Sequence, residues 1–339
     1  MGDHGGVPLV ARAVLGGQLA TGLLEVTDDP GALDRGGRWA VVVGFDGRLT
    51  AARFADWRPY GPAAPSAPWT PVPRGAWRSS LDAAAFRAGV REIRARIAAG
   101  DVYQVNLCRV LEAELPDGAT LTGLHERLAA RHPAPHAAHV LLPGHDVDVA
   151  CASPELFLAR AGEHLVSRPI KGTAATRDGF LPKDRAENVM IVDLVRNDLG
   201  RVCRPGTVRA PEVCGVEEHP GLAHLVSTVE GDLRPGVGWG EILAASFPPG
   251  SVVGAPKLAA LAVIAALEPA DRGPYCGAIG WVDADAGRAE LAVGIRTFWR
   301  TGRTLRFGTG GGITWDSDPD GEWRETELKA ARLLAVAAG

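Results

Sequence analysis

The chain has 339 residues, 46% of them hydrophobic, which is enough for one large domain or two ordinary ones with a sizeable core. Its 36 Lys+Arg and 40 Asp+Glu give a formal charge of −4, so no basic field is present to hold nucleic acid or an anionic membrane. The most apolar run, 258–267, is too short to span a bilayer, and residues 1–10 do not resemble a signal peptide. We therefore expect a cytoplasmic enzyme-sized protein that acts on a small molecule, with no nucleic-acid or membrane partner.

Five cysteines are present, an odd count without any CxxC spacing. This pattern argues against a disulfide framework and against a zinc site. We expect scattered buried thiols at Cys108, Cys151, Cys203, Cys214 and Cys276.

A proline-rich stretch divides the chain near its N-terminal end, with prolines at 59, 62, 65, 68, 71 and 73. This density excludes a helix or a central strand and predicts an extended linker over 59–78. The linker separates a short segment, 1–58, from a main body at 79–339. Within the short segment, apolar runs at 39–45 and 49–54 flank Asp46-Gly47, which predicts a β-hairpin.

The main body begins with an amphipathic helix and a strand. Apolar residues recur at helical spacing up to a stop at Gly100, namely Phe86, Val90, Ile93 and Ile97. Over 101–110 the period changes to two, which places Gln104 and Asn106 on one face and Tyr103, Val105 and Leu107 on the other.

Further strands are predicted at 146–151, 156–160, 165–169, 277–282, 291–299 and 304–308, and helices at 184–203, 254–267 and 322–338. Short turns containing Gly or Asp join most of the strands, so we expect largely antiparallel sheets. Because helices are interspersed without regular βαβ alternation, the fold class is α+β.

Two acidic pairs suggest a cation site. Asp184 and Glu187 lie three residues apart in one predicted helix, and Glu322 and Glu325 do so in another. If these four carboxylates converge, they form a site for a hard divalent cation, with magnesium favoured. The alternative is a solvated surface, in which Glu325 and Lys329 form an ordinary i,i+4 ion pair.

Two features are candidates for binding an anion. The glycine run at 308–313 follows a predicted strand and suggests a nest of backbone N–H groups for a carboxylate or phosphate. It matches neither a P-loop nor GxGxxG, which disfavours a nucleotide site. Arg296, on the predicted strand 291–299, is either a bidentate carboxylate clamp or a structural arginine.

Three further side chains are candidates for chemistry. Lys171 lies between a strand and a Gly turn, where desolvation would lower its pKa while nearby carboxylates would raise it. Glu155 precedes an apolar strand and is a candidate acid with a raised pKa. Taken singly, each also fits a surface charge, and His224 fits a buried core histidine.

Together these segments resemble the chorismate-utilising family, which includes anthranilate synthase component I, aminodeoxychorismate synthase component I, isochorismate synthases and salicylate synthases. The resemblance covers about 86–335. It is carried by GDVYQVNL (100–107), SPELF (153–157), RPIKGT (168–173), DRAENVMIVDLVRNDLGRV (184–202), HLVSTVEG (224–231), FPPGSVVGAPK (247–257), RGPYCGAIGW (272–281), GIRT (294–297) and GGGITWDSDPDGEWRETELKA (310–330).

The resemblance implies a chorismate-binding enzyme fold, α+β with largely antiparallel β-sheets packed as a sandwich with flanking helices. It implies that Glu187 and Glu325 bind Mg²⁺, with Asp184 and Glu322 acting through water. The residues implied to bind chorismate are Gln104, Thr173, His224, Tyr275, Arg296, Gly310, Gly311, Gly312 and Lys329. Glu155 is implied to protonate the departing 4-hydroxyl.

Two positions separate the subfamilies. Where Gln104 stands, the isochorismate and salicylate enzymes have a lysine that activates water, and an amide cannot accept that proton. Lys171 is characteristic of the aminodeoxychorismate synthases, whereas the anthranilate enzymes have alanine. The resemblance therefore implies amination of chorismate through covalent attack by Lys171, with ammonia from a separate glutamine amidotransferase. The alternatives are anthranilate synthesis and a catalytically idle chorismate-binding homologue.

Overall fold

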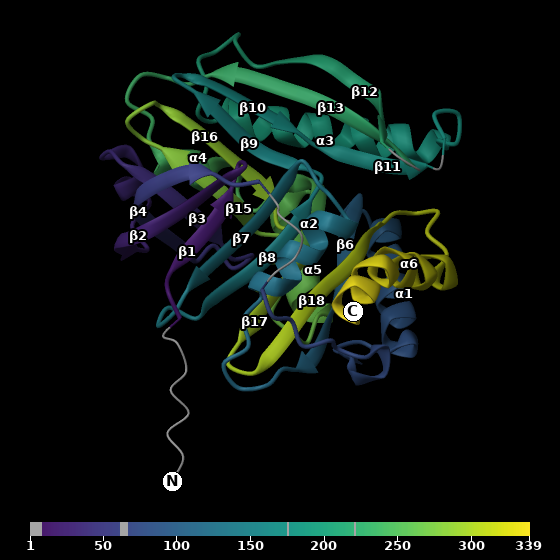
Figure 1. Cartoon of the computed structure of the whole chain (residues 1–339). Helices are drawn as coiled ribbons and strands as arrows, with labels where there is room; N and C mark the ends of the chain where they lie inside the picture. The colour runs from purple at the N-terminus through teal and green to yellow at the C-terminus, as the bar shows by residue number, and fades with distance from the viewer. Residues whose placement is uncertain (1–8, 62–66, 175, 220–221) are drawn as a thin grey trace.

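The computed structural model describes residues 9–61, 67–174, 176–219 and 222–339, which adopt an α+β fold (Figure 1). Antiparallel pairing joins the described strands into one hydrogen-bonded network. The expected fold class is therefore confirmed, while packing of the sheets as a sandwich stays a prediction.

The strands are β1 (Arg12–Leu15), β2 (Gln18–Thr27), β3 (Arg38–Val43), β4 (Leu49–Pro59), β5 (Arg78–Ser79), β6 (Gln104–Glu114), β7 (His136–Leu142), β8 (Val147–Ser153), β9 (Leu156–Ala161), β10 (His164–Arg168), β11 (Ile170–Ala174), β12 (Arg209–His219), β13 (Leu222–Asp232), β14 (Gly254–Ala255), β15 (Ala278–Asp283), β16 (Arg288–Val293), β17 (Thr297–Thr301) and β18 (Thr304–Ile313). The α-helices are α1 (Ala83–Ala99), α2 (Thr122–Arg131), α3 (Pro182–Gly200), α4 (Trp239–Ser246), α5 (Lys257–Leu267) and α6 (Pro319–Ala337). Short 3-10 turns are η1 (Pro30–Asp34), η2 (Arg74–Ala76) and η3 (Gly250–Val252).

The N-terminal hairpin forms as predicted, because β3 and β4 pair on either side of a turn in which Gly47 has a φ of 86°. β3 also pairs along its whole length with β15, and β1 pairs with β7. The N-terminal strands therefore share the sheet of the main body. A division into domains at 59–78 stays a prediction, and residues 62–66 of this linker lie outside the described part.

The predicted first helix and strand are confirmed with one correction. α1 ends at Ala99 and is capped by Gly100, whose φ of 85° suits a glycine, and it buries Phe86 and Val90 in a core shared with Val105. Tyr103 does not share that buried face, since it precedes β6 and is 70% exposed.

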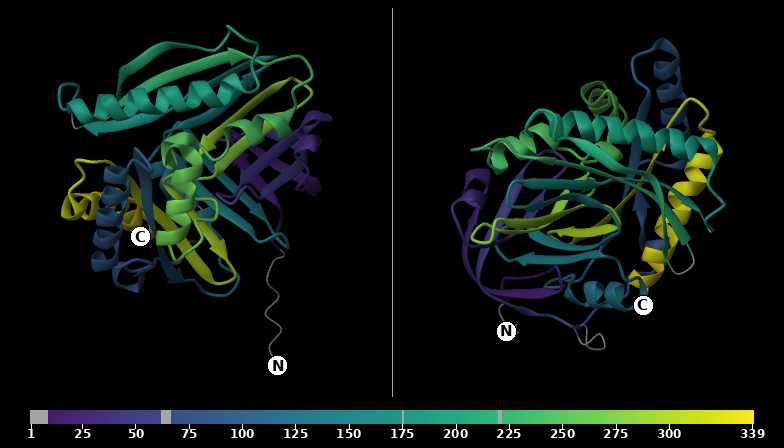
Figure 2. Two further views of the ribbon diagram at one scale, coloured as in Figure 1. Left: turned by 180° about the vertical axis from the view of Figure 1, so that it is seen from behind. Right: turned by 90° about the horizontal axis from the view of Figure 1, so that it is seen from above.

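Two layers position the site. α3 packs along β11, β12 and β13, and the views in Figure 2 show it covering one side of that layer. α6 packs against β18 and α1 in the other layer. The hairpin β12–β13 was not predicted, because its exposed first strand lacks a clean apolar alternation and its pairing carries register shifts.

Most of the expected buried thiols are confirmed. All five cysteines are free, four of them are buried, and Cys214 is half-buried. Among the described residues, no helix combines the length and the apolar character needed to cross a bilayer.

Candidate active site

Lys171 lies on β11, where the strand passes α3. Gly172, with a φ of 84°, permits this approach, because a Cβ there would lie 2.9 Å from Cβ of Asp184. Burial lowers the pKa of Lys171 below its usual 10.5 by disfavouring the ammonium, although the charges of Glu187 and Glu155 act in the opposite direction. The lowered pKa favours the neutral amine, which is the nucleophilic form.

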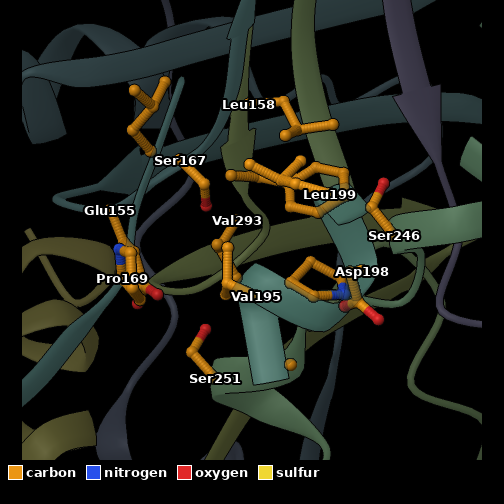
Figure 3. A pocket seen from close by; sticks show the side chains of 14 residues that line it. Glu155, Leu158, Ser167, Pro169, Val195, Asp198, Leu199, Ser246, Ser251 and Val293 are labelled. Carbon is orange, nitrogen blue, oxygen red and sulfur yellow. The ribbon is translucent and has the colours of Figure 1, made fainter. Parts of the chain in front are cut away.

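Glu155 is buried, with 4% of its surface exposed, and immediately precedes β9. Burial raises its pKa to about 7, opposed by a hydrogen bond with Ser251 and by the charge of Lys171. Both Glu155 and Ser251 line a small cavity of about 20 Å³ between the sheet and α3 (Figure 3). A carboxyl group with a pKa near 7 can donate a proton at neutral pH. Sequence reasoning missed Ser251, although it lies within the motif FPPGSVVGAPK.

Gln104, at the start of β6, connects the sheet to α3. Its Nε2 donates a hydrogen bond to Oε2 of Glu187 across 3.1 Å. The side chain is 1% exposed, and its Oε1 has no hydrogen-bond partner among the described residues. The predicted amide of Gln104 therefore faces the acidic residues, whereas Asn106 donates instead to Sγ of Cys108.

The predicted glycine nest is wrong. β18 continues through Gly308 and the three glycines 310–312 and pairs with β6 along this stretch, and none of these glycines has a positive φ. An extended, paired strand cannot present successive N–H groups to one anion, because they alternate in direction and are used by the sheet. Contact of Gly310, Gly311 and Gly312 with a substrate carboxylate stays a prediction, but it would not involve a nest of N–H groups.

The glycines instead provide space on both sides of β18. A Cβ at Gly312 would lie 2.2 Å from Nε2 of Gln104 and 3.4 Å from Nζ of Lys171. A Cβ at Gly311 would lie 3.2 Å from Oε2 of Glu322 and 3.7 Å from Oε1 of Glu325. Larger residues would therefore displace the side chains that gather at the site.

The carboxylates of α3 and α6 are each held by protein groups. Oδ2 of Asp184 accepts a hydrogen bond from the N–H of Leu181 at 2.7 Å and so caps α3. Oε1 of Glu322 accepts from Ser317 at 2.6 Å, and Oε1 of Glu325 pairs with Nζ of Lys329 at 2.6 Å. The i,i+4 pair of the alternative interpretation is thus present. Lys329 also donates to the backbone oxygen of Gly310 at 3.1 Å.

The pKa values of these carboxylates shift in different directions. Burial raises the pKa of Glu187 and that of Glu322. Burial alone would also raise the pKa of Glu325, but Lys329, together with Lys183 and Lys171, outweighs it and the net pKa is lowered. Glu187 and Glu325 lie close enough for the charge of Glu325 to raise the pKa of Glu187.

Within the described part of the chain, no three side chains of the usual ligand types are arranged to hold a metal ion. The donors nevertheless fit Mg²⁺ in kind, because carboxylate oxygens are the hard ligands that this ion prefers. The buried Glu322 and the half-buried Glu187 both have raised pKa values, and an added cation would stabilise their charged forms. Binding of Mg²⁺ by Glu187 and Glu325, with Asp184 and Glu322 acting through water, stays a prediction.

Arg296 does not lie on a strand, which corrects the predicted strand 291–299. β16 ends at Val293 and β17 begins at Thr297, with Arg296 between them at a φ of 53°. This left-handed conformation is unfavourable for a residue with a side chain and is typical of functional sites. Nη1 of Arg296 lies 3.3 Å from Nε2 of His132, a residue that carried no signal in the sequence.

The remaining predicted residues lie on the elements around the site. Tyr275 is 5% exposed, packs behind Gly308 and places its hydroxyl 3.7 Å from Sγ of Cys108. His224 is buried on β13, opposite Thr173 of β11 in the strand register. The side chain of Thr173 lies outside the described part. Contacts of these three residues with a substrate stay predictions.

Comparison with known proteins assigns the class. The family model described as chorismate binding enzyme matches residues 48–335, so the chain belongs to the family of chorismate binding enzymes. It is 38% identical to aminodeoxychorismate synthase component 1 of Salmonella typhimurium (strain LT2) over 271 residues, which cover 76% of this chain and 59% of that protein.

A second relative is anthranilate synthase component 1 of Streptomyces coelicolor, 40% identical over 286 residues, which cover 80% of this chain and 55% of that protein. The chain therefore spans little more than half the length of these relatives. The fold matches a crystal structure of a putative 2,3-dihydroxybenzoate-specific isochorismate synthase, DhbC, from Bacillus anthracis, with a TM-score of 0.79, 24% identity and 96% of each chain covered.

Proposed function

We propose that the chain converts chorismate and ammonia to 4-amino-4-deoxychorismate, a precursor of para-aminobenzoate. The observation that carries this proposal is the pairing of an amine and an acid in one site. The pKa of Lys171 is lowered by burial, and that of Glu155 is raised to about 7. The first shift increases the share of neutral, nucleophilic amine, and the second allows the carboxyl group to protonate a leaving hydroxyl near neutral pH.

The amine of Lys171 attacks C2 of the ring while the bond between C4 and its hydroxyl breaks. Glu155 donates its proton to this hydroxyl, which leaves as water. Ammonia then forms the bond to C4, and the bond between C2 and the lysine nitrogen breaks, which releases Lys171 as a neutral amine once the excess proton has returned to Glu155. The enolpyruvyl group is retained.

Substrate binding supports the same assignment. Arg296 is a guanidinium suited to a carboxylate, and chorismate carries two. The acidic residues Glu187 and Glu325, with Asp184 and Glu322 behind them, would hold Mg²⁺, and a bound Mg²⁺ would neutralise the ring carboxylate of chorismate. Lys329 lies beside Glu325 and Gly310, where it can contact the same carboxylate.

A second candidate is anthranilate synthesis, which the relative from Streptomyces coelicolor favours. That reaction adds ammonia directly at C2 and needs no lysine nucleophile. Lys171, with its lowered pKa, opposes this candidate, because a buried amine without a role would be an unfavourable feature.

Ammonia is proposed to come from a separate glutamine amidotransferase. The relative from Salmonella is named component 1 of its synthase, and no G-x-C-x-G nucleophile turn of a glutaminase occurs in this sequence. The purified chain should therefore use ammonium salts and not glutamine. Amination that depends on glutamine in the purified single chain would contradict this.

The decisive experiment incubates the purified chain with chorismate, MgCl₂ and ammonium chloride and identifies the product by chromatography and mass spectrometry. 4-Amino-4-deoxychorismate supports the proposal. Fluorescent anthranilate would establish the second candidate instead. Unchanged chorismate, in a protein that still binds it, would identify an idle homologue.

A further inference from the structure

Arg296 has an unusual setting for an arginine. It is half-buried, and it forms no ion pair with any carboxylate in the described part of the chain. Its hydrogen bond is with a histidine, between Nη1 and Nε2 of His132 at 3.3 Å. A partly buried guanidinium without an acidic partner is costly unless an anion completes the site.

A second arginine increases this imbalance. Burial lowers the pKa of Arg296, and the nearby charge of Arg332 on α6 lowers it further, although the charge of Glu155 acts in the opposite direction without forming an ion pair. Burial, Arg296 and Arg332 together also lower the pKa of His132, which favours its neutral form. Repulsion from Arg332 would displace the guanidinium of Arg296 from the position beside His132. A neutral hydrogen-bond acceptor is needed to hold it there.

His132 is well placed to be that acceptor. It follows the last residue of α2, and its N–H donates to the backbone oxygen of Leu128 at 2.7 Å. Leu124 and Leu128 anchor α2 in the core, and α2 packs against α6. Because a guanidinium can only donate, the lone pair of Nε2 must face Arg296, and the ring proton must lie on Nδ1.

We propose that His132 is a positioning residue that holds Arg296 in the orientation that receives a carboxylate of the substrate. This inference rests on the proposed function, since it assumes that Arg296 binds chorismate. His132 itself does not contact the reacting atoms. Its effect is on the affinity for a dicarboxylate substrate, because a guanidinium held in place loses less conformational freedom when the carboxylate binds.

Two amide substitutions of His132 distinguish the loss of the hydrogen-bond acceptor from the loss of the imidazole ring itself. The amide oxygen of His132→Gln reaches about as far as Nε2 and can replace it as the acceptor, whereas that of His132→Asn is shorter and cannot. We expect His132→Asn to raise KM for chorismate about tenfold with kcat nearly unchanged, the signature of a lost ground-state and transition-state contact. We expect His132→Gln to restore KM to within about twofold of the wild-type value.

Initial rates at varied chorismate, with saturating MgCl₂ and ammonium chloride, give KM and kcat for each variant. Arg131→Leu, at the exposed last residue of α2, is the matched control and should leave both constants unchanged. His132 follows the last residue of α2 and is only half-buried, so His132→Asn is expected to fold, and melting temperatures verify this.

The inference is overturned if His132→Asn keeps the wild-type KM. It is also overturned if both amide variants lose kcat and melting temperature together, which would indicate a structural role. Failure of the proposed function is distinguishable, since the wild-type protein would then consume no chorismate or would form anthranilate.

Discussion

Gln104 and Glu187 are joined by a hydrogen bond of 3.1 Å that connects β6 to α3, although 83 residues separate them in the sequence. The amide occupies the acidic side of the site and fixes one oxygen of Glu187. If Glu187 binds Mg²⁺ as proposed, this contact would orient the other oxygen of the carboxylate for the ion. We therefore expect Gln104 to support Glu187, in addition to any contact of its own with chorismate.

We predict that Gln104→Leu weakens the response to magnesium. Loss of the donor leaves Glu187 free to turn, and removal of such supporting contacts costs about 10- to 100-fold in metal affinity. The MgCl₂ concentration for half-maximal activity should rise accordingly. Asn197→Leu, an exposed amide on α3, is the control. An unchanged magnesium dependence in Gln104→Leu would show that this contact does not orient a ligand.

Gly312→Ala should damage activity while leaving the fold intact. The new Cβ would lie 2.2 Å from Nε2 of Gln104, at the far end of a flexible side chain that can move aside at little cost in stability. Moving it breaks the contact with Glu187, so we expect kcat/KM to fall by about tenfold or more. Gly200→Ala, where a Cβ meets nothing within 4 Å, is the control. Equal activity of both variants would refute the argument.

Glu187→Gln and Glu325→Gln should each abolish turnover with the fold intact. A site that loses one carboxylate binds Mg²⁺ poorly and leaves the substrate carboxylate uncompensated. Activity assays and circular dichroism provide the two readouts, with Asp193→Asn on the exposed face of α3 as the control. Full activity in both variants, or wild-type activity in the presence of a chelator, would rule out the metal assignment.

Lys171→Ala should lose most formation of aminodeoxychorismate yet still bind chorismate, because Arg296 and the acidic residues remain. Intact-mass measurement of the wild-type protein, incubated with chorismate and MgCl₂ without ammonia, should detect a covalent adduct. The adduct should be absent from Lys171→Ala and present in Lys183→Ala, a control at an exposed lysine of α3. Product formation by Lys171→Ala at the wild-type rate would eliminate the covalent mechanism.

The stability of the protein should reveal the titration of Glu155. Its folded pKa of about 7 exceeds the ordinary 4.5, so its contribution is fully present below pH 4.5 and is lost as pH rises through 7. The free energy of unfolding should therefore fall by about 3 kcal/mol more in the wild type than in Glu155→Gln between pH 4.5 and 8. Urea denaturation at both pH values measures this, with exposed Glu241→Gln as the control. Parallel pH profiles would contradict the raised pKa.

Local patterns in the sequence were sufficient to predict several elements and the family. The period of Phe86, Val90 and Ile93 predicted α1, and Asp46-Gly47 predicted the hairpin β3–β4, because such signals depend on near neighbours. The ordered motifs around Lys171, Glu155 and Glu187 predicted the family that the comparisons confirm.

Only the tertiary structure decided the burial, the pKa shifts and the contacts of those groups. The pKa of Lys171 depends on burial and on the charges of Glu155 and of residues on α3 and α6, and the local sequence does not show how these effects combine. The glycines at 310–312 look like a turn in sequence, but pairing with β6 extends them into β18. The contact of His132 with Arg296 joins residues 164 positions apart. Sequence determined which side chains are available, whereas burial and long-range contacts determined their charge and orientation.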